Sequence, residues 1–480
     1  MSILVVDVGT SGVRAAVVDP GGAVGALTYR EVLPSTPGTG MVELDARALA
    51  AAALDVATEA LAGAGPVEAV GIANQRATTV VWDRATGEPV APGIGWQDLR
   101  TVGACLMLQA QGLRIAPNAS GTKVSAILDM VDWGRERDLC FGTIDTWIAW
   151  ALSGGSLHVT DATNAGVTGM TMVDRAAWDP HALELLRVPE SCLPQIVDSS
   201  GAIGELSALP GAPVLAGIAG DQQASLIGQA CVHPGQAKAT FGTGGMLDCI
   251  TGPRVGFHQR GGGGCFPIIA RQRAGEPVWG VEAITLSAGT CIEWLRDDLG
   301  LIATSAESES VAASCESSAG VWFVPALLGL GTPRWDYGAR GTLLGLTRGS
   351  GRPEIVRAVL EGIAHRGADM LEAAEADAGV TIEALRVDGG MSANSVFTQA
   401  LADACGVPIE VSPEREATTL GAAYLAGLAT GTWASEADLA SMWKPARVVE
   451  PRRGGTDRER WKSAVDRAAG WIPELSSLDF

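Results

Sequence analysis

Two glycine-bracketed hairpin patterns, far apart along the chain, constrain the fold more than any other feature. ILVVD and VRAAVVD are apolar runs of strand length that flank the turn VGTSG, so the segment Ile3–Asp19 is predicted to form a β-hairpin. More than two hundred residues downstream, AKATF and MLDCI flank the turn GTGG in the same way. A pattern that recurs at this distance indicates a duplicated domain architecture.

Segments that alternate between strand and helix patterns separate the hairpins and follow them. Helical spacing is found in LDARALAAAALDVATEALAGAG, SAGTCIEWLRDDLG and PEIVRAVLEGIAHRGADMLEAAEADAG, and strand patterns are found in VEAVGIANQ, TTVVWD and ALRVDGG. This alternation is typical of α/β layers with a mixed sheet. We expect one domain over residues 1–225, a second over 226–440 and a helical tail over 441–480, and the length of 480 residues fits that division. Within the tail, DRERWKSAVDRAAGWI is predicted to be an amphipathic helix that packs on the body.

Charge and cysteine usage exclude several classes of protein. The chain has 34 Lys and Arg against 54 Asp and Glu, a net charge of −20, so neither nucleic acid nor an anionic membrane surface is an expected partner. No secretory signal is predicted, and no apolar run reaches the roughly 18 residues of a membrane span. The nine cysteines are scattered without CxxC spacing, which suits a reducing compartment. We therefore expect a cytoplasmic protein.

Glycine-rich turns at strand ends are candidate phosphate sites. In Asp7–Gly12 the glycines let the backbone approach a phosphate, and main-chain N–H groups with the hydroxyls of Thr10 and Ser11 can cradle it. Asp7 at the strand end can hold magnesium through water. An ordinary hairpin turn is the alternative, and for this segment alone it is favoured. Phe241–Gly245 repeats the pattern, and two such loops could grip a triphosphate from opposite walls of a cleft.

Two further strand ends carry polar residues that have alternative roles. Val387–Asn394 could admit a flat ligand such as adenine, with Asn394 as a hydrogen-bonding partner, or it could be a plain strand-to-helix turn. Asp221 follows the strand pattern PVLAGI and precedes the helical QQASLIGQ. It could be a helix N-cap, or a general base that accepts a hydroxyl proton as the oxygen attacks phosphorus. Position alone favours the cap.

Arg76 and Trp96 follow strand patterns in the first half. Arg76 could donate a bidentate hydrogen bond to substrate hydroxyls, and Trp96 could present an apolar face to a carbon skeleton. Taken singly, a surface arginine and a packed tryptophan are the more common explanations.

Together these residues resemble the FGGY carbohydrate kinases, and within them the glycerol kinase branch. The resemblance spans nearly the whole chain. It is carried by DVGTSGVR, GIANQRATTVVWDRATGEP, WQDLRT, SGTK, FGTIDTWIAWALSGGSLHVTDATNA, GIAGDQQASLIGQACVHPGQAKATFGTGG, GLGTPRWDYGARG, RVDGGMSAN and TTLGAAYLAG. It implies two ribonuclease-H-like domains of the actin/hexokinase type that face a central cleft, where ATP and a sugar would bind. It also implies in-line transfer of the γ-phosphoryl group to a substrate hydroxyl.

The resemblance implies a nucleotide site that draws on both halves. Its residues would be Thr10, Ser11, Gly12 and Arg14 in the first phosphate loop, Gly242 and Thr243 in the second, and Gly289, Glu293, Gly390 and Asn394 around the nucleotide. Asp7 would lie near Mg²⁺. On the substrate side, Asp221 would be the catalytic base with Gln222 as its neighbour, and Arg76 and Trp96 would line the polyol pocket.

The departures from the glycerol kinase pattern concern the substrate. Ala77 stands where these kinases have the glutamate of QRET, Asn118 where they have a tyrosine, and Met246 where they have an aromatic residue. Glu293 replaces a glutamine near the nucleotide. Each lost hydrogen bond costs about 0.5–1.5 kcal/mol. We therefore expect glycerol to be a poor substrate and a larger polyol or sugar to be phosphorylated, with Ala77 making room for it.

Two alternatives remain. One is a true glycerol kinase with a rebuilt pocket. The other is a catalytically silent sugar- or nucleotide-binding regulator, which would be expected to have lost its base or a phosphate loop, whereas Asp7, Asp221 and Thr243 are all present. A homodimer is expected from the family resemblance alone.

Overall fold

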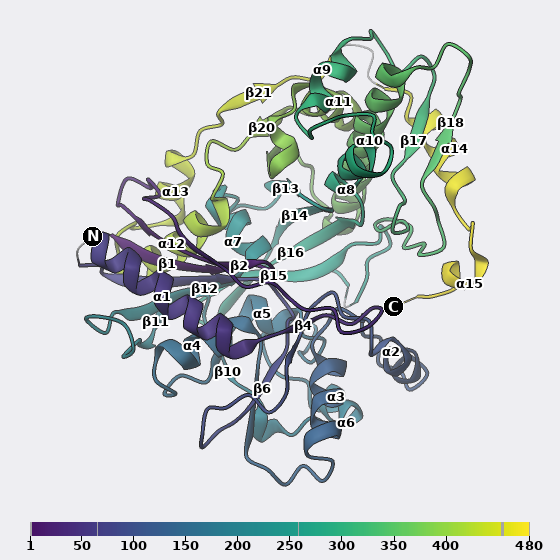
Figure 1. The fold of residues 1–480 in the computed structure, drawn as a ribbon. Helices are drawn as coiled ribbons and strands as arrows, with labels where there is room; N and C mark the ends of the chain where they lie inside the picture. Colours follow the sequence, from purple (N-terminus) through teal and green to yellow (C-terminus); the bar gives the residue numbers. More distant parts are fainter. Residues whose placement is uncertain (1, 65, 258, 453–455, 480) are drawn as a thin grey trace.

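Two mixed β-sheets form the centres of the two halves of the computed structural model, which describes residues 2–64, 66–257, 259–452 and 456–479 (Figure 1). The first sheet has the strand order β11-β12-β5-β1-β2-β3. Its strands are β1 (Ile3–Val8), β2 (Gly12–Val18), β3 (Thr28–Glu31), β5 (Ala69–Asn74), β11 (Ser200–Glu205) and β12 (Val214–Gly220). The second sheet has the order β15-β16-β14-β13-β19-β20-β21. Its strands are β13 (Ala237–Phe241), β14 (Gly245–Gly252), β15 (Phe266–Arg273), β16 (Glu276–Thr285), β19 (Leu385–Asp388), β20 (Ile409–Val411) and β21 (Arg447–Val449).

Both predicted hairpins are confirmed. Strands β1 and β2 pair antiparallel from Ile3↔Val18 to Val8↔Val13, and residues 9–11 form the turn. Strands β13 and β14 pair antiparallel from Ala237 to Phe241, and residues 242–244 form the turn. Each turn has three residues and begins with a glycine, Gly9 in the first and Gly242 in the second.

The two sheets share one pattern of strand pairing, which confirms the predicted duplication. From β11 to β3 the neighbouring strands run antiparallel, parallel, parallel, antiparallel and antiparallel. From β21 the second sheet repeats the same five relations and then adds β15 as a further antiparallel strand. The fold is therefore α/β with two related domains, as predicted.

Helices cover both faces of the sheets. In the first half, α1 (Ala46–Ala64) and α4 (Ile144–Leu152) pack on one face, and α12 (Ala417–Thr430) packs on the other beside β1, β5 and β12 (Figure 1). In the second half, α10 (Arg352–Ala378) packs on β14 and β16, and α11 (Ser395–Cys405) packs on α10. By its place in the sequence α12 belongs to the predicted second domain, residues 226–440. In the structure it packs on the sheet of the first half.

The remaining helices and strands complete the two halves. The helices are α2 (Val102–Gln109), α3 (Gly121–Val131), α5 (Ala162–Gly166), α6 (Pro180–Leu186), α7 (Asp221–Gly228), α8 (Gly289–Glu293), α9 (Glu307–Ala313), α13 (Glu436–Met442), α14 (Arg458–Ala468) and α15 (Pro473–Ser476). Three short two-stranded sheets pair β4 (Glu43–Leu44) with β7 (Gly93–Ile94), β6 (Val80–Asp83) with β8 (Leu139–Gly142), and β9 (Val159–Asp161) with β10 (Gln195–Val197). A fourth pairs β17 (Trp322–Val324) with β18 (Thr342–Leu344).

Helices α7 and α12 cross with their backbones in contact. A Cβ atom placed on Gly228 would lie 1.9 Å from the carbonyl oxygen of Ala417, and one on Gly421 would lie 1.7 Å from that of Ala224. Both distances are far below any atomic contact, so only glycine fits at the crossing. This contact fixes α7, and therefore Asp221 at its first residue, against the first sheet.

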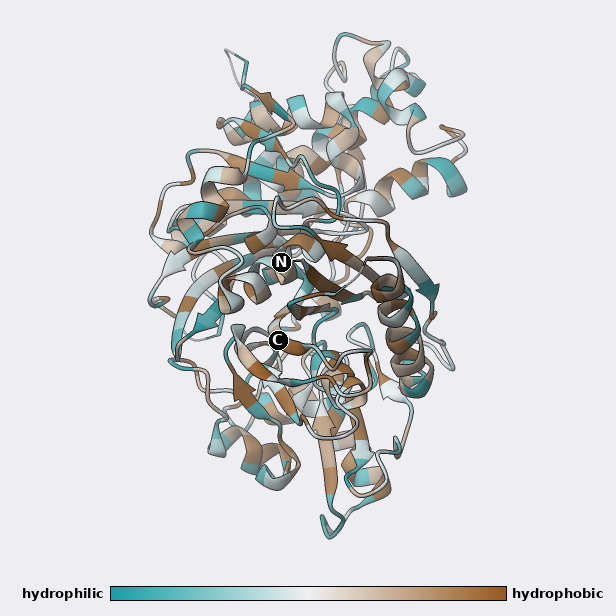
Figure 2. Ribbon diagram, turned by 90° about the vertical axis from the view of Figure 1, so that its left-hand side faces the viewer, coloured by the Kyte–Doolittle hydropathy of each residue, from teal (hydrophilic) through white to brown (hydrophobic). Residues whose placement is uncertain are grey.

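Apolar residues line the buried sides of these elements. Figure 2 shows the apolar colouring concentrated on the central strands, and the strand β1 is buried along its full length. The predicted tail helix is confirmed as α14, which packs Trp461 and Val465 against Val324 and Leu330. Within the described residues, no helix has the length and apolar character that a bilayer crossing requires.

Candidate active site

The first glycine-rich turn lies beside a charged cluster. Asp7 and Arg14 are directly opposed on β1 and β2, and Arg14 Nε lies 3.5 Å from Asp7 Oδ2. Arg14 Nη1 also contacts Glu416 Oε2 at 2.8 Å, which ties the turn to the start of α12. Burial raises the pKa of Asp7 to about 7, Arg14 opposes that rise, and the carboxylates of Asp221 and Glu416 add to it.

This surplus of negative charge fits a cation site. Mg²⁺ is bound in proteins by one or two carboxylates together with water and substrate phosphates. Burial is the main cause of the raised pKa of Asp7, and the nearby carboxylates of Asp221 and Glu416 add to the rise, so a divalent cation would relieve their repulsion. Among the described residues no group of three or more His, Cys, Asp or Glu side chains forms a cage of its own. Asp7 therefore fits a magnesium ion that arrives with the nucleotide.

The glycines of the predicted nucleotide site differ in what surrounds them. A Cβ atom on Gly12 would lie 2.5 Å from both Arg30 O and Tyr29 Oη, so the packing of β3 itself requires this glycine. Gly242 and Gly390 have no protein atom within 4 Å of such a Cβ position. These two glycines leave open space in which a ligand could approach the backbone.

The second glycine-rich turn meets the start of α8. Gly289 N donates a hydrogen bond to Gly242 O at 2.8 Å, and Thr290 Oγ1 donates to Thr243 O at 3.2 Å. Three of the predicted nucleotide residues, Gly242, Thr243 and Gly289, are thus brought together by the structure. Glu293 ends the same short helix and is exposed.

The third glycine-rich strand end is a strand-to-helix turn in which Asn394 caps α11. Asn394 Oδ1 accepts a hydrogen bond from Phe397 N at 3.0 Å, and Nδ2 donates to Ser308 Oγ at 3.1 Å. Asn394 is therefore observed as a helix cap, and a contact of Asn394 with the nucleotide stays a prediction. Asp388, at the end of β19, accepts hydrogen bonds from Ser225 Oγ in α7 and from Gln229 Nε2 directly after it, each at 2.8 Å.

Asp221 is not a helix cap. It is the first residue of α7, the capping position is Gly220, and no side chain caps this end. Asp221 Oδ1 accepts a hydrogen bond from Gln222 N at 2.8 Å, and 35% of the side chain is exposed. Burial raises the pKa of the Asp221 carboxyl, and Arg76, whose Nε lies 3.6 Å away, opposes the rise. The carboxylate is therefore free of the competing capping role and has the raised proton affinity of a general base.

Arg76 is a buried residue that joins the two halves. It follows β5 of the first sheet, and its Nη2 lies 2.6 Å from Glu282 Oε2 on β16 of the second sheet. Only 11% and 7% of the two side chains are exposed. Burial raises the pKa of Glu282 to about 7, and Arg76 opposes that rise. Met246 also lies here, with its Sδ 3.9 Å from Arg76 Nη2.

A second buried ion pair lies on the neighbouring strands. Lys238 Nζ on β13 is 2.8 Å from Asp248 Oδ2 on β14, and neither side chain is exposed. Lys238 Nζ also donates to Gln222 Oε1 at 2.5 Å. The pair therefore reaches the residue next to Asp221.

Trp96 and the residues after β5 form the other side of the site. Trp96 Nε1 donates to Thr10 Oγ1 at 3.3 Å, which links the predicted polyol pocket to the first phosphate loop. Ala77 is buried in the left-handed region with φ of +62°, and its carbonyl accepts from Ser120 Oγ at 2.9 Å. Asn118 is exposed.

Lys123 holds this side of the site together. Its Nζ donates to the main-chain oxygens of Trp96 and Asn118, at 3.2 and 2.9 Å. Burial lowers the pKa of Lys123 to about 7. The side chain is fully buried and both of these contacts are with neutral carbonyl groups.

Sequence reasoning missed four of these charged residues. Lys238, Asp248 and Glu282 each stand within an apolar strand run, in AKATF, MLDCI and WGVEAIT, and Lys123 stands within the apolar face of α3. A charge in a run that is otherwise buried is costly unless it is paired. A charged residue within an apolar run was therefore the signal by which these four residues could have been found.

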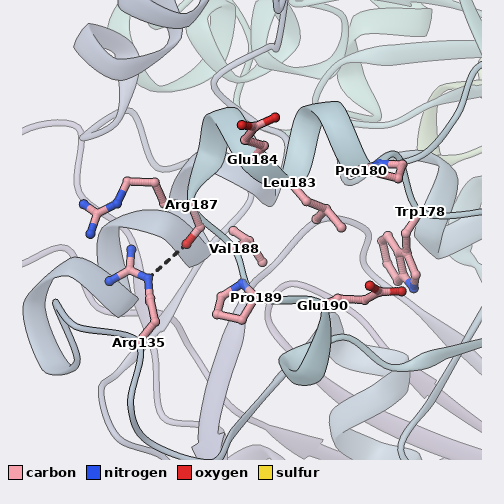
Figure 3. Close-up of a pocket in the computed structure, with 9 residues that line it drawn as sticks. All are labelled: Arg135, Trp178, Pro180, Leu183, Glu184, Arg187, Val188, Pro189 and Glu190. Carbon is pink, nitrogen blue, oxygen red and sulfur yellow. Dashed lines mark hydrogen bonds between the residues drawn. The ribbon is translucent and has the colours of Figure 1, made fainter.

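A separate hollow lies away from the site. It has a volume of about 410 Å³ and is lined by residues such as Trp178, Leu183 and Arg187 near α6 (Figure 3). Figure 3 shows Arg135 donating a hydrogen bond to the main-chain oxygen of Arg187 at its rim, at 2.9 Å. None of the residues predicted for the active site lines this hollow, so the site is defined by the side chains that converge on Asp221 and Arg76.

The sequence matches two family models. Residues 2–228 match the N-terminal domain, and residues 263–430 the C-terminal domain, of the FGGY family of carbohydrate kinases. Glycerol kinase from Trichlorobacter lovleyi is 43% identical over 98% of this chain and 99% of its own length, and glycerol kinase from Deinococcus radiodurans is 43% identical over 98% of each. The crystal structure of Plasmodium falciparum glycerol kinase with ADP superposes with a TM-score of 0.90, at 27% identity, over 100% of this chain and 99% of that one.

Proposed function

Because this chain belongs to the FGGY family of carbohydrate kinases, we propose that its phosphoryl acceptor is glycerol. The chain is an ATP-dependent phosphotransferase that acts on a carbohydrate or polyol, and not the silent regulator considered above. Glycerol as the acceptor is supported by relatives named glycerol kinase, which are 43% identical over nearly their full length. This proposal replaces our expectation from the sequence that glycerol is a poor substrate.

The position of Asp221 carries the mechanism. Its carboxylate does not cap the helix, has a raised pKa because it is buried, and lies beside the buried Arg76. In the proposed reaction a glycerol hydroxyl gives its proton to Asp221 while its oxygen attacks the γ-phosphorus of ATP. The new O–P bond forms as the bond to the β,γ-bridging oxygen breaks, and ADP leaves with that electron pair.

The other residues bind and orient. The turns at residues 9–11 and 242–244 would hold the phosphates, and Gly390 would leave space for the nucleotide. Asp7 would hold Mg²⁺, which when bound neutralises phosphate charge. Arg76 would donate hydrogen bonds to the acceptor, and Trp96 would cover its carbon chain.

Glu282 bears directly on glycerol as the substrate. The glutamate that glycerol kinases have at position 77 is absent, yet a carboxylate still lies 2.6 Å from Arg76 because β16 supplies Glu282. Arg76 is thus paired with a carboxylate although residue 77 is alanine. This pairing weakens the argument that the missing glutamate at position 77 excludes glycerol.

A larger polyol is the second candidate. Ala77, Asn118 and Met246 together remove a carboxylate, a phenol and an aromatic ring from the pattern of glycerol kinases. The loss of bulk at these positions favours an acceptor with four or five carbons.

The test is ADP release from ATP and magnesium with glycerol, erythritol, ribitol, xylitol and D-xylulose. We expect glycerol to give the highest kcat/KM, and Asp221→Asn to lower kcat by roughly 10²- to 10⁴-fold. Asp55→Asn, at an exposed position of α1, is the matched control and should leave kcat unchanged. A higher kcat/KM with a four- or five-carbon acceptor would favour the second candidate, and no ADP release with any acceptor would contradict both.

A further inference from the structure

We propose that Lys238 and Asp248 are a positioning pair for the substrate site, in which Asp248 holds Lys238 and Lys238 fixes the side-chain amide of Gln222 with its NH₂ group available to the acceptor. The inference deepens the proposed function and rests on it. It assigns a role to a buried charge pair that takes no direct part in phosphoryl transfer.

The pair belongs to a ladder of charges across three neighbouring strands. Lys238 on β13 is directly opposite Asp248 on β14, and Asp248 is directly opposite Glu282 on β16. All three side chains are buried. The ladder ends at Arg76, which Glu282 holds at 2.6 Å. Its two ends therefore meet the two residues that flank the candidate base, Gln222 at one end and Arg76 at the other.

The hydrogen-bond capacity of Lys238 decides the orientation of Gln222. An ammonium group has three donors and no acceptor. Lys238 Nζ donates hydrogen bonds to Gln222 Oε1 at 2.5 Å and to Thr240 Oγ1 at 3.1 Å, and it forms an ion pair with Asp248 Oδ2 at 2.8 Å. Gln222 must therefore present its oxygen to Lys238, because the amide NH₂ group and the ammonium group are both hydrogen-bond donors and cannot bond to each other. The NH₂ group is left to face other partners.

The chemistry of the acceptor follows from this arrangement. Arg76 and the Gln222 NH₂ group can only donate hydrogen bonds, and Asp221 can only accept while it is ionised. The site therefore matches a compound whose hydroxyl oxygens accept from Arg76 and Gln222 while one hydroxyl donates to Asp221. A neutral polyol satisfies all three groups. An ammonium group in place of the hydroxyl that meets Gln222 or Arg76 would face a donor and be rejected.

If Lys238 and Asp248 served only the stability of the fold, their replacement would affect kinetics differently. Replacing a buried ion pair by apolar residues of similar size is often neutral or stabilising. Lys238→Met with Asp248→Leu removes the pair in this way and leaves no unpaired charge. If the pair served stability alone, the double variant would keep the kinetic constants of the wild type.

The experiment measures KM and kcat for glycerol, and kcat/KM for serinol (2-amino-1,3-propanediol), in the wild type and in the double variant. We expect the double variant to melt at or above the wild-type temperature. Because the Gln222 amide can then rotate, KM for glycerol should rise roughly two- to tenfold, kcat should change less, and the preference for glycerol over serinol should narrow by a similar factor.

Two further variants make the test specific. Arg271→Met with Glu436→Leu removes another largely buried ion pair, whose atoms approach to 2.5 Å between β15 and α13, and should leave KM and the serinol preference unchanged. Gln222→Glu keeps an oxygen for Lys238 but has no NH₂ group. It should raise KM in the same way, and it tests the inference even if the double variant does not fold.

Two results would overturn the inference. One is a folded double variant with wild-type KM and wild-type preference for glycerol over serinol, and the other is wild-type KM in Gln222→Glu. Failure of the proposed function is seen separately, because it shows in the wild type alone as a different best acceptor or as no ADP release. If a larger polyol is the best acceptor, the same KM comparison is made with that polyol.

Discussion

The two hairpins share one geometry but hold their opposite charges at different depths. In the first, Asp7 opposes Arg14 one residue from the turn, and 37% of the Arg14 side chain is exposed. In the second, Lys238 opposes Asp248 farther from the turn, and both side chains are fully buried. A pair beside a turn can meet a ligand, whereas a pair within the sheet acts only through the residues it holds. The duplicated fold thus places the same pairing of opposite charges in two different environments.

The two buried lysines Lys238 and Lys123 differ in the charge of their partners. Lys238 has a carboxylate partner in Asp248, whereas Lys123 donates to the carbonyl oxygens of Trp96 and Asn118. An ammonium group that is desolvated without an anion loses its proton more readily. The lowered pKa of Lys123, about 7, agrees with that reasoning.

The largest expected difference separates the two hairpin pairs. Lys238→Met leaves the Asp248 carboxylate buried and unpaired, so the free energy of unfolding should fall by about 3–5 kcal/mol. Arg14→Met removes a partly exposed partner, and Asp7, whose pKa is about 7, can bind a proton instead, so the loss should be smaller, about 1–2 kcal/mol, while KM for ATP should rise. Urea unfolding of both variants measures the difference. Equal losses would mean that burial does not distinguish the two pairs.

Lys123 should make the stability of the protein depend on pH. The folded-state pKa of Lys123 is depressed from 10.5 to about 7, so the stability it contributes is present above pH 10.5 and is lost as pH falls toward 7. Relative to Lys123→Met, the wild type should gain at most about 1.4 kcal/mol per pH unit between pH 7 and 10. Lys462→Met, at a half-exposed position of α14, should show no such trend. A constant difference across this range would show that Lys123 stays protonated.

Alanine should lower stability at a glycine of the helix crossing, and it should weaken ATP binding at a glycine of the predicted phosphate turn. Gly421→Ala forces a methyl group onto the carbonyl of Ala224 and should lower the free energy of unfolding by about 1–3 kcal/mol. Gly242→Ala meets no protein atom and should leave stability within about 0.5 kcal/mol, but raise KM for ATP. Thermal unfolding and ATP kinetics on both variants decide this. An unchanged KM in Gly242→Ala would argue against nucleotide binding at that turn.

The smallest expected effect concerns the link between the halves at Asp388. Ser225→Ala removes one of the two hydrogen bonds that Ser225 and Gln229 donate to this buried carboxylate, so the free energy of unfolding should fall by about 1 kcal/mol. Ser441→Ala, an exposed position whose hydroxyl donates within α13, is the control and should change little. A loss in the control equal to that in Ser225→Ala would remove any special role for the contact.

Much of the fold could be predicted from the sequence because its signals are local. The apolar runs around glycine-rich turns gave both hairpins, and helical spacing gave α1, α10 and α14. The match between the two sheets was visible as a short repeated pattern. These features depend on residues close in the sequence, where turn chemistry and periodicity act directly.

The roles of individual site residues depended on small shifts that local patterns do not determine. Position alone favoured Asp221 as a cap, but α7 starts at Asp221 itself and its carboxylate does not cap the helix, whereas Asn394 does cap its helix. A helix start that moves by one residue exchanges these roles. Sequence reasoning places helix ends less accurately than that.

The sequence by itself determined the duplicated α/β fold, the glycine-rich turns and the kinase family, because each is encoded in short segments with their own turn and periodicity signals. Only the tertiary structure decided that Arg76 is paired with Glu282 and that Lys238 reaches Gln222. These partners come from elements that are far apart in the sequence, and the Arg76–Glu282 pair joins the two halves. Which charges neutralise each other is a property of the packed molecule, since burial both brings the groups together and makes their pairing necessary.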